Sequence, residues 1–108
     1  MAKFIKGDVV VIPFPFSDLT GSKRRPALVL ADLPGDDIIL CQITSQSSAD
    51  IFAIPLTPAD FTNGSLPSLS NIRPTRIFTA DKNIIIRKTG TVNTVISEKV
   101  AKVLIKLF

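Results

Sequence analysis

The feature that most restricts the fold of this chain is a series of short apolar runs, each ended within a few residues by proline, glycine or a polar turn. The first run, residues 9–12 (VVVI), is apolar at every position and precedes Pro13 and Pro15. β-branched residues favour strands, and a run that is apolar on both faces is typical of a central or barrel strand. Because proline lacks a backbone N–H, we expect regular pairing to end at Pro13 and Pro15.

Further strands are expected at short spacing, over residues 26–30, 37–44, 51–56 and 70–79. The segment 84–88 (IIIRK), which begins with three isoleucines, leads to Gly90. Pro26 stands at the first position of its predicted strand, where a missing N–H is tolerated, and Pro74 interrupts the strand over 70–79. Residues 59–69, between the predicted strands at 51–56 and 70–79, are expected to form a connection with one helical turn before Ser65.

The last part of the chain has helical periodicity. Asn93 is suited to an N-cap, and the apolar positions 96, 100, 103, 104 and 107 share one face. Lysines at 99, 102 and 106 occupy the other side. Short strands followed by one amphipathic helix predict a mainly β (α+β) domain over residues 1–108, a small, partly open β-barrel with a C-terminal α-helix.

The amino-acid composition limits which partners and which catalytic groups the protein can use. The formal net charge of +4 favours partners that carry phosphates or carboxylates. The chain has no histidine, which excludes a Ser-His-Asp triad, a Cys-His dyad and most zinc sites. Any catalysis must therefore use Arg, Lys, Ser, Thr, Asp or Glu.

The same composition indicates where the protein acts. Cys41 is the only cysteine, so no intrachain disulfide can form and a reducing cytosol is expected. No apolar run approaches the roughly 20 residues of a membrane helix, and the polar residues 6–8 interrupt the N-terminal segment before it could form a signal peptide. We expect a cytoplasmic protein without membrane contact.

Three basic clusters are the candidates for binding an anion: residues 23–25 (KRR), the pair Arg73 and Arg76, and Lys82 with residues 87–88. They are equally compatible with a solvated surface and with a track for phosphates. Arginine suits a phosphate track because its planar fork can hold two phosphate oxygens. The backbone N–H groups of Gly21 and Ser22 could add donors.

Polar residues at the end of the predicted third strand are a second candidate. Thr44 and Ser45 stand at its exit, although such a pair more often serves a turn or a cap. Gln42 and Gln46 could read base edges, or could be ordinary polar residues at a strand end. Cys41 lies in an apolar stretch without metal-ligand spacing, which favours core packing.

Four blocks of the chain, in the same order, give a resemblance to a known family: GDVVVIPFPFSDLTGSKRRPALVL at 7–30, CQITSQ at 41–46, SNIRPTRIFTADK at 70–82 and KTG at 88–90. They resemble the MazF/PemK (Kid) toxins of toxin–antitoxin systems. The resemblance implies an SH3-like barrel, a homodimer, and cleavage of single-stranded RNA without a metal or other cofactor, through a 2′,3′-cyclic phosphate. It also implies an antitoxin whose acidic, apolar tail covers the substrate groove.

The resemblance also assigns residues. The family's essential arginine falls on Arg25, which would stabilise the charged phosphorane, and its threonine falls on Thr44, which would bond a phosphate oxygen or the 2′-hydroxyl. The loop over 13–22 would help to select the RNA, and Arg76 stands where the family usually carries glutamine. The expected RNA contacts are Ser22, Lys23, Arg24, Ser45, Gln46, Arg76 and Lys82.

Two alternatives remain open from the sequence. Toxins of the CcdB type use the same fold to bind DNA gyrase through a C-terminal helix with an apolar tip, which Phe108 would match, but such a binder does not need the RRP block. A catalytically inactive RNA-binding member of the fold is the other. Seven phenylalanines and a mean hydropathy of +0.36 leave apolar surface to spare, which independently predicts a dimer.

Overall fold

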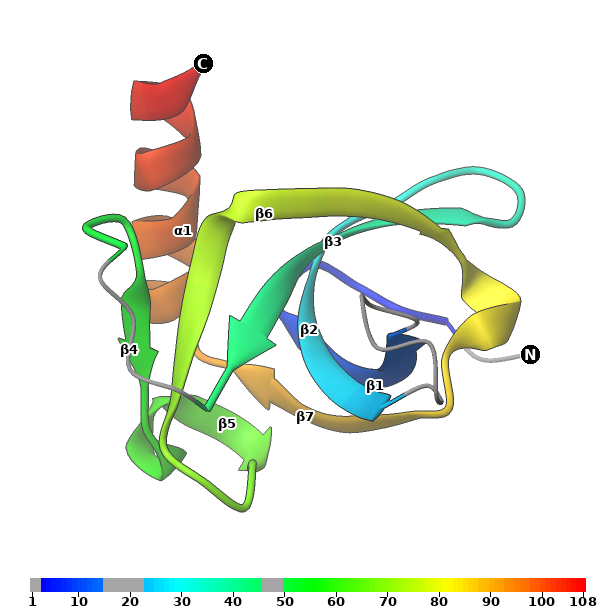
Figure 1. Cartoon of the computed structure of the whole chain (residues 1–108), viewed down its shortest axis with the longest axis horizontal. Helices are drawn as coiled ribbons and strands as arrows, with labels where there is room; N and C mark the ends of the chain where they lie inside the picture. Colours follow the sequence, from blue (N-terminus) through cyan, green and yellow to red (C-terminus); the bar gives the residue numbers. More distant parts are fainter. Residues whose placement is uncertain (1–2, 15–22, 46–49) are drawn as a thin grey trace.

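The computed structural model describes residues 3–14, 23–45 and 50–108. Over these ranges seven strands form one antiparallel sheet in the order β4-β6-β3-β2-β1-β7-β5. Figure 1 shows the sheet curled into a partly open barrel, with α1 on one side and β6 arching across the molecule. The predicted fold class is confirmed. The elements are β1 (Asp8–Phe14), β2 (Lys23–Asp32), β3 (Asp37–Thr44), β4 (Ile54–Leu56), the 3-10 turn η1 (Pro58–Asp60), β5 (Phe61–Gly64), β6 (Ser70–Asp81), the 3-10 turn η2 (Lys82–Ile84), β7 (Arg87–Val92) and α1 (Thr94–Leu107).

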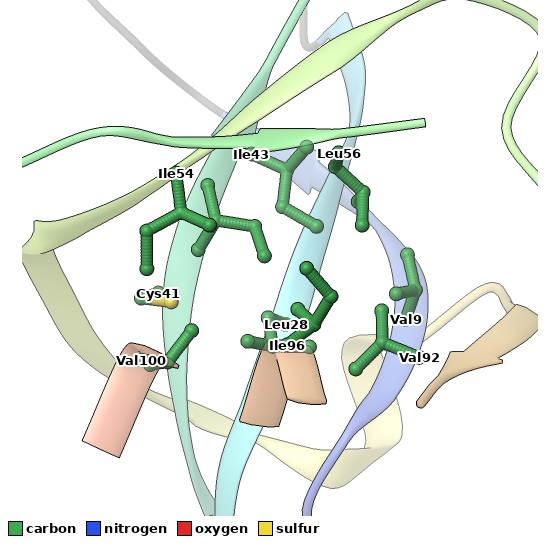
Figure 2. Close-up of a cluster of buried hydrophobic side chains, with 10 residues drawn as sticks. Val9, Leu28, Cys41, Ile43, Ile54, Leu56, Val92, Ile96 and Val100 are labelled. Carbon is green, nitrogen blue, oxygen red and sulfur yellow. The ribbon is translucent and has the colours of Figure 1, made fainter. Parts of the chain in front are cut away.

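Both faces of the central strands are buried, as the apolar run at 9–12 predicts. Val9 pairs with Leu28 on one face, and Val10 pairs with Ala27 on the other. The first face packs under α1, where Ile96 and other side chains close the cluster (Figure 2). The second face has a cluster of its own: Phe4, Val10, Ile12, Ala27, Val29, Ile38 and Leu40. Two small cores thus hold the sheet from both sides.

Pro13 does not end the pairing of β1 and Pro26 does not begin β2, so two expectations were wrong. Pro13 pairs with Arg24, and Pro26 lies inside β2 opposite Val11. The pairing of β1 with β7 stops at Val11, so Pro13 lies where β1 has a paired neighbour on one side only. A proline is tolerated there because its missing N–H can face the unpaired edge. β2 therefore starts at Lys23, within the basic cluster itself.

The middle of the chain follows the prediction in part. β3 has the predicted bounds and η1 supplies a helical turn before Ser65, but β4 is shorter than expected and β5 was not predicted. β5 forms because Gly64 adopts φ +66° and crosses very close to β7, where a Cβ would overlap the carbonyl oxygen of Thr89. β7 begins at Arg87, within the segment 84–88 rather than at its start, because η2 ends at Ile84.

The C-terminal helix is confirmed in its cap and its face. The Asn93 side-chain oxygen accepts a hydrogen bond from the Ile96 amide at 3.0 Å. Ile96 and Val100 are buried against the sheet, and residues 103, 104 and 107 are half-buried on the same face. None of the helices in the described ranges has the length and apolarity needed to cross a bilayer.

Candidate functional site

A cavity of about 300 Å³ opens where β2 begins and β3 ends. Its wall combines three kinds of side chain, which come from five strands (β1, β2, β3, β6 and β7), from the residue after β3 and from the segment before β6. The lining residues are the arginines Arg24, Arg25 and Arg87; the hydroxyl residues Ser45, Ser68, Ser70 and Thr89; and the apolar residues Val11, Pro26, Ile43, Leu66 and Pro67.

The pairing of β1 brings the arginines together. Val11 pairs with Pro26 of β2 on one side and with Arg87 of β7 on the other. Arg24 and Arg25 directly precede Pro26, so the three guanidinium-bearing residues come from strands on either side of β1. Residues distant in sequence therefore meet at one end of the sheet.

The charge of this cavity is not compensated by the residues that the structure describes. Of those residues, no carboxylate lines the cavity, and the ion pairs among them use Arg73, Lys82 and Lys88 instead. Arg24 is exposed and Arg25 is half-buried. Like charges gathered in a cleft with apolar walls produce a positive potential, so the cavity is suited to an anion.

Two hydroxyl groups of the wall are already used to shape it. Thr89 Oγ1 donates to the carbonyl oxygen of Ser65 at 2.9 Å, and Ser70 Oγ donates to that of Ser68 at 3.0 Å. These bonds hold the segment 65–68 against β6 and β7. A hydroxyl has a single proton, so Thr89 and Ser70 can offer a ligand only their lone pairs. Ser45, by contrast, is exposed at the mouth of the cavity.

Thr44 lies beside the cavity but is not one of its lining residues. It is the last residue of β3, only 9% of its surface is exposed, and it pairs with Asn71 of β6. The β2–β3 ladder reaches Ala27 opposite Gln42. That ladder ends two residues before Thr44, so Thr44 is held by its pairing with β6 rather than by pairing with β2.

The structure places two of the predicted RNA contacts elsewhere. Lys82 Nζ donates to the carbonyl oxygens of Leu33 at 2.7 Å and Gly35 at 2.8 Å, and pairs with Asp32 at 2.7 Å. It therefore fastens η2 to the turn between β2 and β3, beside a separate cavity of about 550 Å³. Arg76 is exposed on β6 and does not line the arginine cavity.

Other predictions fall outside the described residues. These are Ser22, Gln46, the side chain of Lys23 and most of the predicted selecting loop. Cys41 is buried in the first core, as its apolar surroundings predict, and burial raises the pKa of its thiol to about 12. Within the described ranges, no group of three or more acidic or cysteine side chains is gathered as a metal site.

Arg87 is the cavity arginine that the sequence placed in a candidate basic cluster but not among the expected RNA contacts. The sequence places it in a basic cluster with Lys82 and Lys88 and gives no sign that it differs from them. In the structure Lys88 lies 3.9 Å from the buried carboxylate of Asp8, whereas Arg87 lines the cavity. Alternation along a strand separates the two, and that separation could be inferred only once the β1–β7 register was known.

The fold and the site together describe a small, partly open β-barrel with a positively charged cavity at one end of its sheet. The model of PemK-like, MazF-like toxins of type II toxin–antitoxin systems matches residues 5–108, and the chain belongs to this family. A comparison with curated protein sequences gives no match. The family resemblance drawn from the four sequence blocks is thereby confirmed.

Solved structures with low sequence identity share the fold. An endoribonuclease in complex with its cognate antitoxin, from a mycobacterial species, is 16% identical with a TM-score of 0.73, and the match covers 98% of this chain and 93% of that one. A MazE–MazF structure from Deinococcus radiodurans is 17% identical with a TM-score of 0.75, covering 99% and 96%. The toxin MazF-mt6 of Mycobacterium tuberculosis is 15% identical with a TM-score of 0.71, covering 90% and 91%. None of these matches supports the gyrase-binding alternative.

Proposed function

We propose that this protein is an endoribonuclease toxin that cleaves single-stranded RNA, in particular mRNA, at the arginine cavity. The observation that carries the proposal is the set of three arginines in one cavity, without a lining carboxylate among the described residues. Family membership supports the reaction type, as do relatives of the same fold that are endoribonucleases. Because mRNA is the proposed substrate, the cytoplasm is the expected place of action.

The reaction requires the 2′-hydroxyl of one nucleotide to attack the adjacent phosphorus. A bond forms between the 2′-oxygen and phosphorus, the bond from phosphorus to the 5′-oxygen breaks, and the proton lost by the 2′-hydroxyl is balanced by one gained at the 5′-oxygen. The products are a 2′,3′-cyclic phosphate and a 5′-hydroxyl. The barrier is lowered mainly by stabilising the negative charge that develops on the phosphorane oxygens.

Arg25 is the residue proposed to stabilise that charge. It is the half-buried arginine of the pair on β2, and a guanidinium can hold two oxygens at once. Arg24 and Arg87 would hold neighbouring phosphates and keep the strand in register with Arg25. Proton donation by arginine is costly because of its high pKa, so its proposed role is electrostatic.

Thr44 and Ser45 supply the proposed hydroxyl groups. Ser45 lines the cavity directly, and its hydroxyl can reach a ligand there. Thr44 is the last residue of β3 and directly precedes Ser45, and its hydroxyl is proposed to orient the 2′-hydroxyl or a phosphate oxygen from the strand end. RNA contacts at Ser22, Lys23 and Gln46 remain part of the proposal, whereas Lys82 is better explained by its bonds to the β2–β3 turn.

The proposed protein partners are a cognate antitoxin and a second copy of the chain. The family is defined by toxin–antitoxin pairing, and one fold relative was solved with its antitoxin. An acidic antitoxin tail would compete with RNA for the arginine cavity because both are anions. A homodimer is supported by exposed apolar side chains such as Ile105 and Phe108, which are 76% and 92% exposed.

Cleavage of a mixed pool of single-stranded RNAs in the presence of EDTA tests the proposal. RNA ends sequenced after incubation with the purified protein should reveal defined cleavage positions. Arg25→Ala should lower the cleavage rate about 100-fold or more, the usual cost of removing one preorganised stabiliser. Arg25→Lys should recover only part of that loss, because lysine keeps the charge but not the fork.

Lys102→Ala is the matched control, since it removes one positive charge from the exposed side of α1. It should cleave like the unmodified protein. Intact RNA across varied sequences, with a folded protein, would overturn the proposed function. Equal rates for Arg25→Ala and Lys102→Ala would instead show that the cavity is not the active site.

A further inference from the structure

The Asp50 carboxylate has three bonding partners, and it lies outside the lining of the arginine cavity. One carboxylate oxygen accepts a hydrogen bond from the Phe52 amide at 2.9 Å. The other accepts bonds from Arg73 Nε at 3.3 Å and from Thr75 Oγ1 at 3.1 Å. The Asp50 side chain is only 8% exposed and that of Arg73 23%, so this ion pair is not an ordinary solvated surface contact.

The network holds an irregular part of β6. Cys41 of β3 pairs with Ile77, but the next residue, Gln42, pairs with Arg73. Residues 74–76 therefore have no partner in β3 and form a three-residue excursion. Pro74 within it has no amide proton to pair, so the β3–β6 ladder itself does not fix the excursion. Thr75 is bonded to Asp50 instead.

The same network joins this excursion to residues 50–52, which precede β4. β3 ends at Thr44, Ser45 lines the cavity, and Asp50 is the first residue described after the segment 46–49. On β6, Ser70 lines the cavity three residues before Arg73. Asp50 thus joins residues 50–52 to β6, the strand whose first residue lines the cavity.

We propose that Asp50 is a positioning residue of the cavity, acting through Arg73 and Thr75 to fix the β6 excursion, and with it the strand whose first residue lines the cavity, relative to Arg25. This rests on the proposed RNA cleavage. It gives the two arginines of β6 different roles. Arg73 is neutralised by Asp50 and serves structure, whereas Arg76 is exposed at the end of the excursion and is outside the lining of the cavity.

A positioning role has a kinetic signature. Phosphates would still be bound by the cavity arginines, so KM should change little, while misalignment of the reacting phosphate should lower kcat. We expect Asp50→Asn to lower kcat about 10-fold or more with KM within about 3-fold of the unmodified value. Arg73→Lys, which keeps the charge opposite Asp50, should retain more activity than Arg73→Ala.

Asp60 provides a matched control because its carboxylate has similar partners in another place. It accepts bonds from the amide and the hydroxyl of Thr57 at 2.8 and 3.1 Å, at the η1 turn. Asp60→Asn should lower the melting temperature without lowering kcat. Hydrogen exchange without RNA gives a readout besides activity: Asp50→Asn should speed exchange at 50–53 and 73–77, and Asp60→Asn should not.

The experiment measures kcat, KM and hydrogen exchange for these variants on one cleavable single-stranded RNA. An unchanged kcat in Asp50→Asn, or the same kcat in the Asp50 and Asp60 variants, would overturn the positioning role while leaving RNA cleavage intact. Unchanged exchange at 50–53 and 73–77 would also overturn it. Absence of cleavage by the unmodified protein would overturn both proposals, and that failure is visible before any variant is compared.

Discussion

Raising the salt concentration should weaken RNA binding by an amount that the cavity arginines determine. Each phosphate charge neutralised on a single strand contributes about −0.7 to the slope of log affinity against log salt. Three lining arginines, Arg24, Arg25 and Arg87, therefore predict a slope of about −2.1 per cavity. Between about 50 mM and about 200 mM monovalent salt, binding should weaken about 20-fold.

Removing one arginine changes that slope in a defined way. Arg87→Gln should make the slope shallower by about 0.7, so that the same rise in salt weakens binding only about 7-fold. Arg24→Gln should behave alike, because both residues line the cavity. Lys102→Gln removes an equal charge from α1 and should leave the slope unchanged.

The assay is fluorescence anisotropy with a labelled single-stranded RNA that carries 2′-O-methyl groups, which block the attacking hydroxyl while keeping the phosphates. Dissociation constants are measured at a series of salt concentrations for each variant. A slope that stays the same in both arginine variants would refute the reasoning, because the charge of the cavity would then not be what holds RNA. An equal change of slope in Lys102→Gln would refute it as well.

Three further predictions concern stability and reactivity. The buried thiol of Cys41, whose pKa burial raises to about 12, should resist alkylation in the native protein and react once denaturant unfolds it; rapid native labelling followed by mass spectrometry would contradict this. The hydrogen bond from the Phe52 amide, helped by Thr75 and Arg73, lowers the pKa of Asp50 despite its burial. The stability that Asp50 contributes should thus be complete above its unfolded pKa of about 3.9 and be lost as pH falls through the lower folded value. Urea unfolding at several pH values should show that acid lowers the free energy of unfolding less in Asp50→Asn than in the unmodified protein. An identical pH dependence of the two proteins would contradict this prediction. Asn93→Ala removes the N-cap of α1 and should cost about 1 kcal/mol, a fall of about 5 °C in Tm by calorimetry, whereas no change would mean the cap contributes nothing.

Local sequence signals predicted those elements whose cause is itself local. Asn93 and the apolar spacing after it specify α1, and the polar turn before Asp37 specifies the start of β3. The predictions at Pro13 and Pro26 were wrong because the energetic cost of a proline in a strand depends on how many neighbouring strands pair with that strand at the same position. That number is a property of the sheet rather than of the strand.

The site shows the same division. Arg24, Arg25 and Ser45 could be selected from the sequence because they lie near strand ends within two of the four blocks that carry the family resemblance. Arg87 could not, since only the pairing of Val11 with both β2 and β7 brings it to the cavity. Lys82 was selected as a candidate RNA contact, but its bonds to the backbone carbonyl oxygens of Leu33 and Gly35 could not be seen in the sequence.

The chemistry proposed for the arginine cavity can be read from the ends of its products. Mass spectrometry of a short single-stranded RNA, incubated with the purified protein in EDTA, identifies both fragments. The account predicts a 5′ fragment that ends in a 2′,3′-cyclic phosphate and a 3′ fragment that begins with a 5′-hydroxyl, and neither should form with Arg25→Ala. Fragments that carry a 5′-phosphate, or the same products at the same rate from Arg25→Ala, would contradict it.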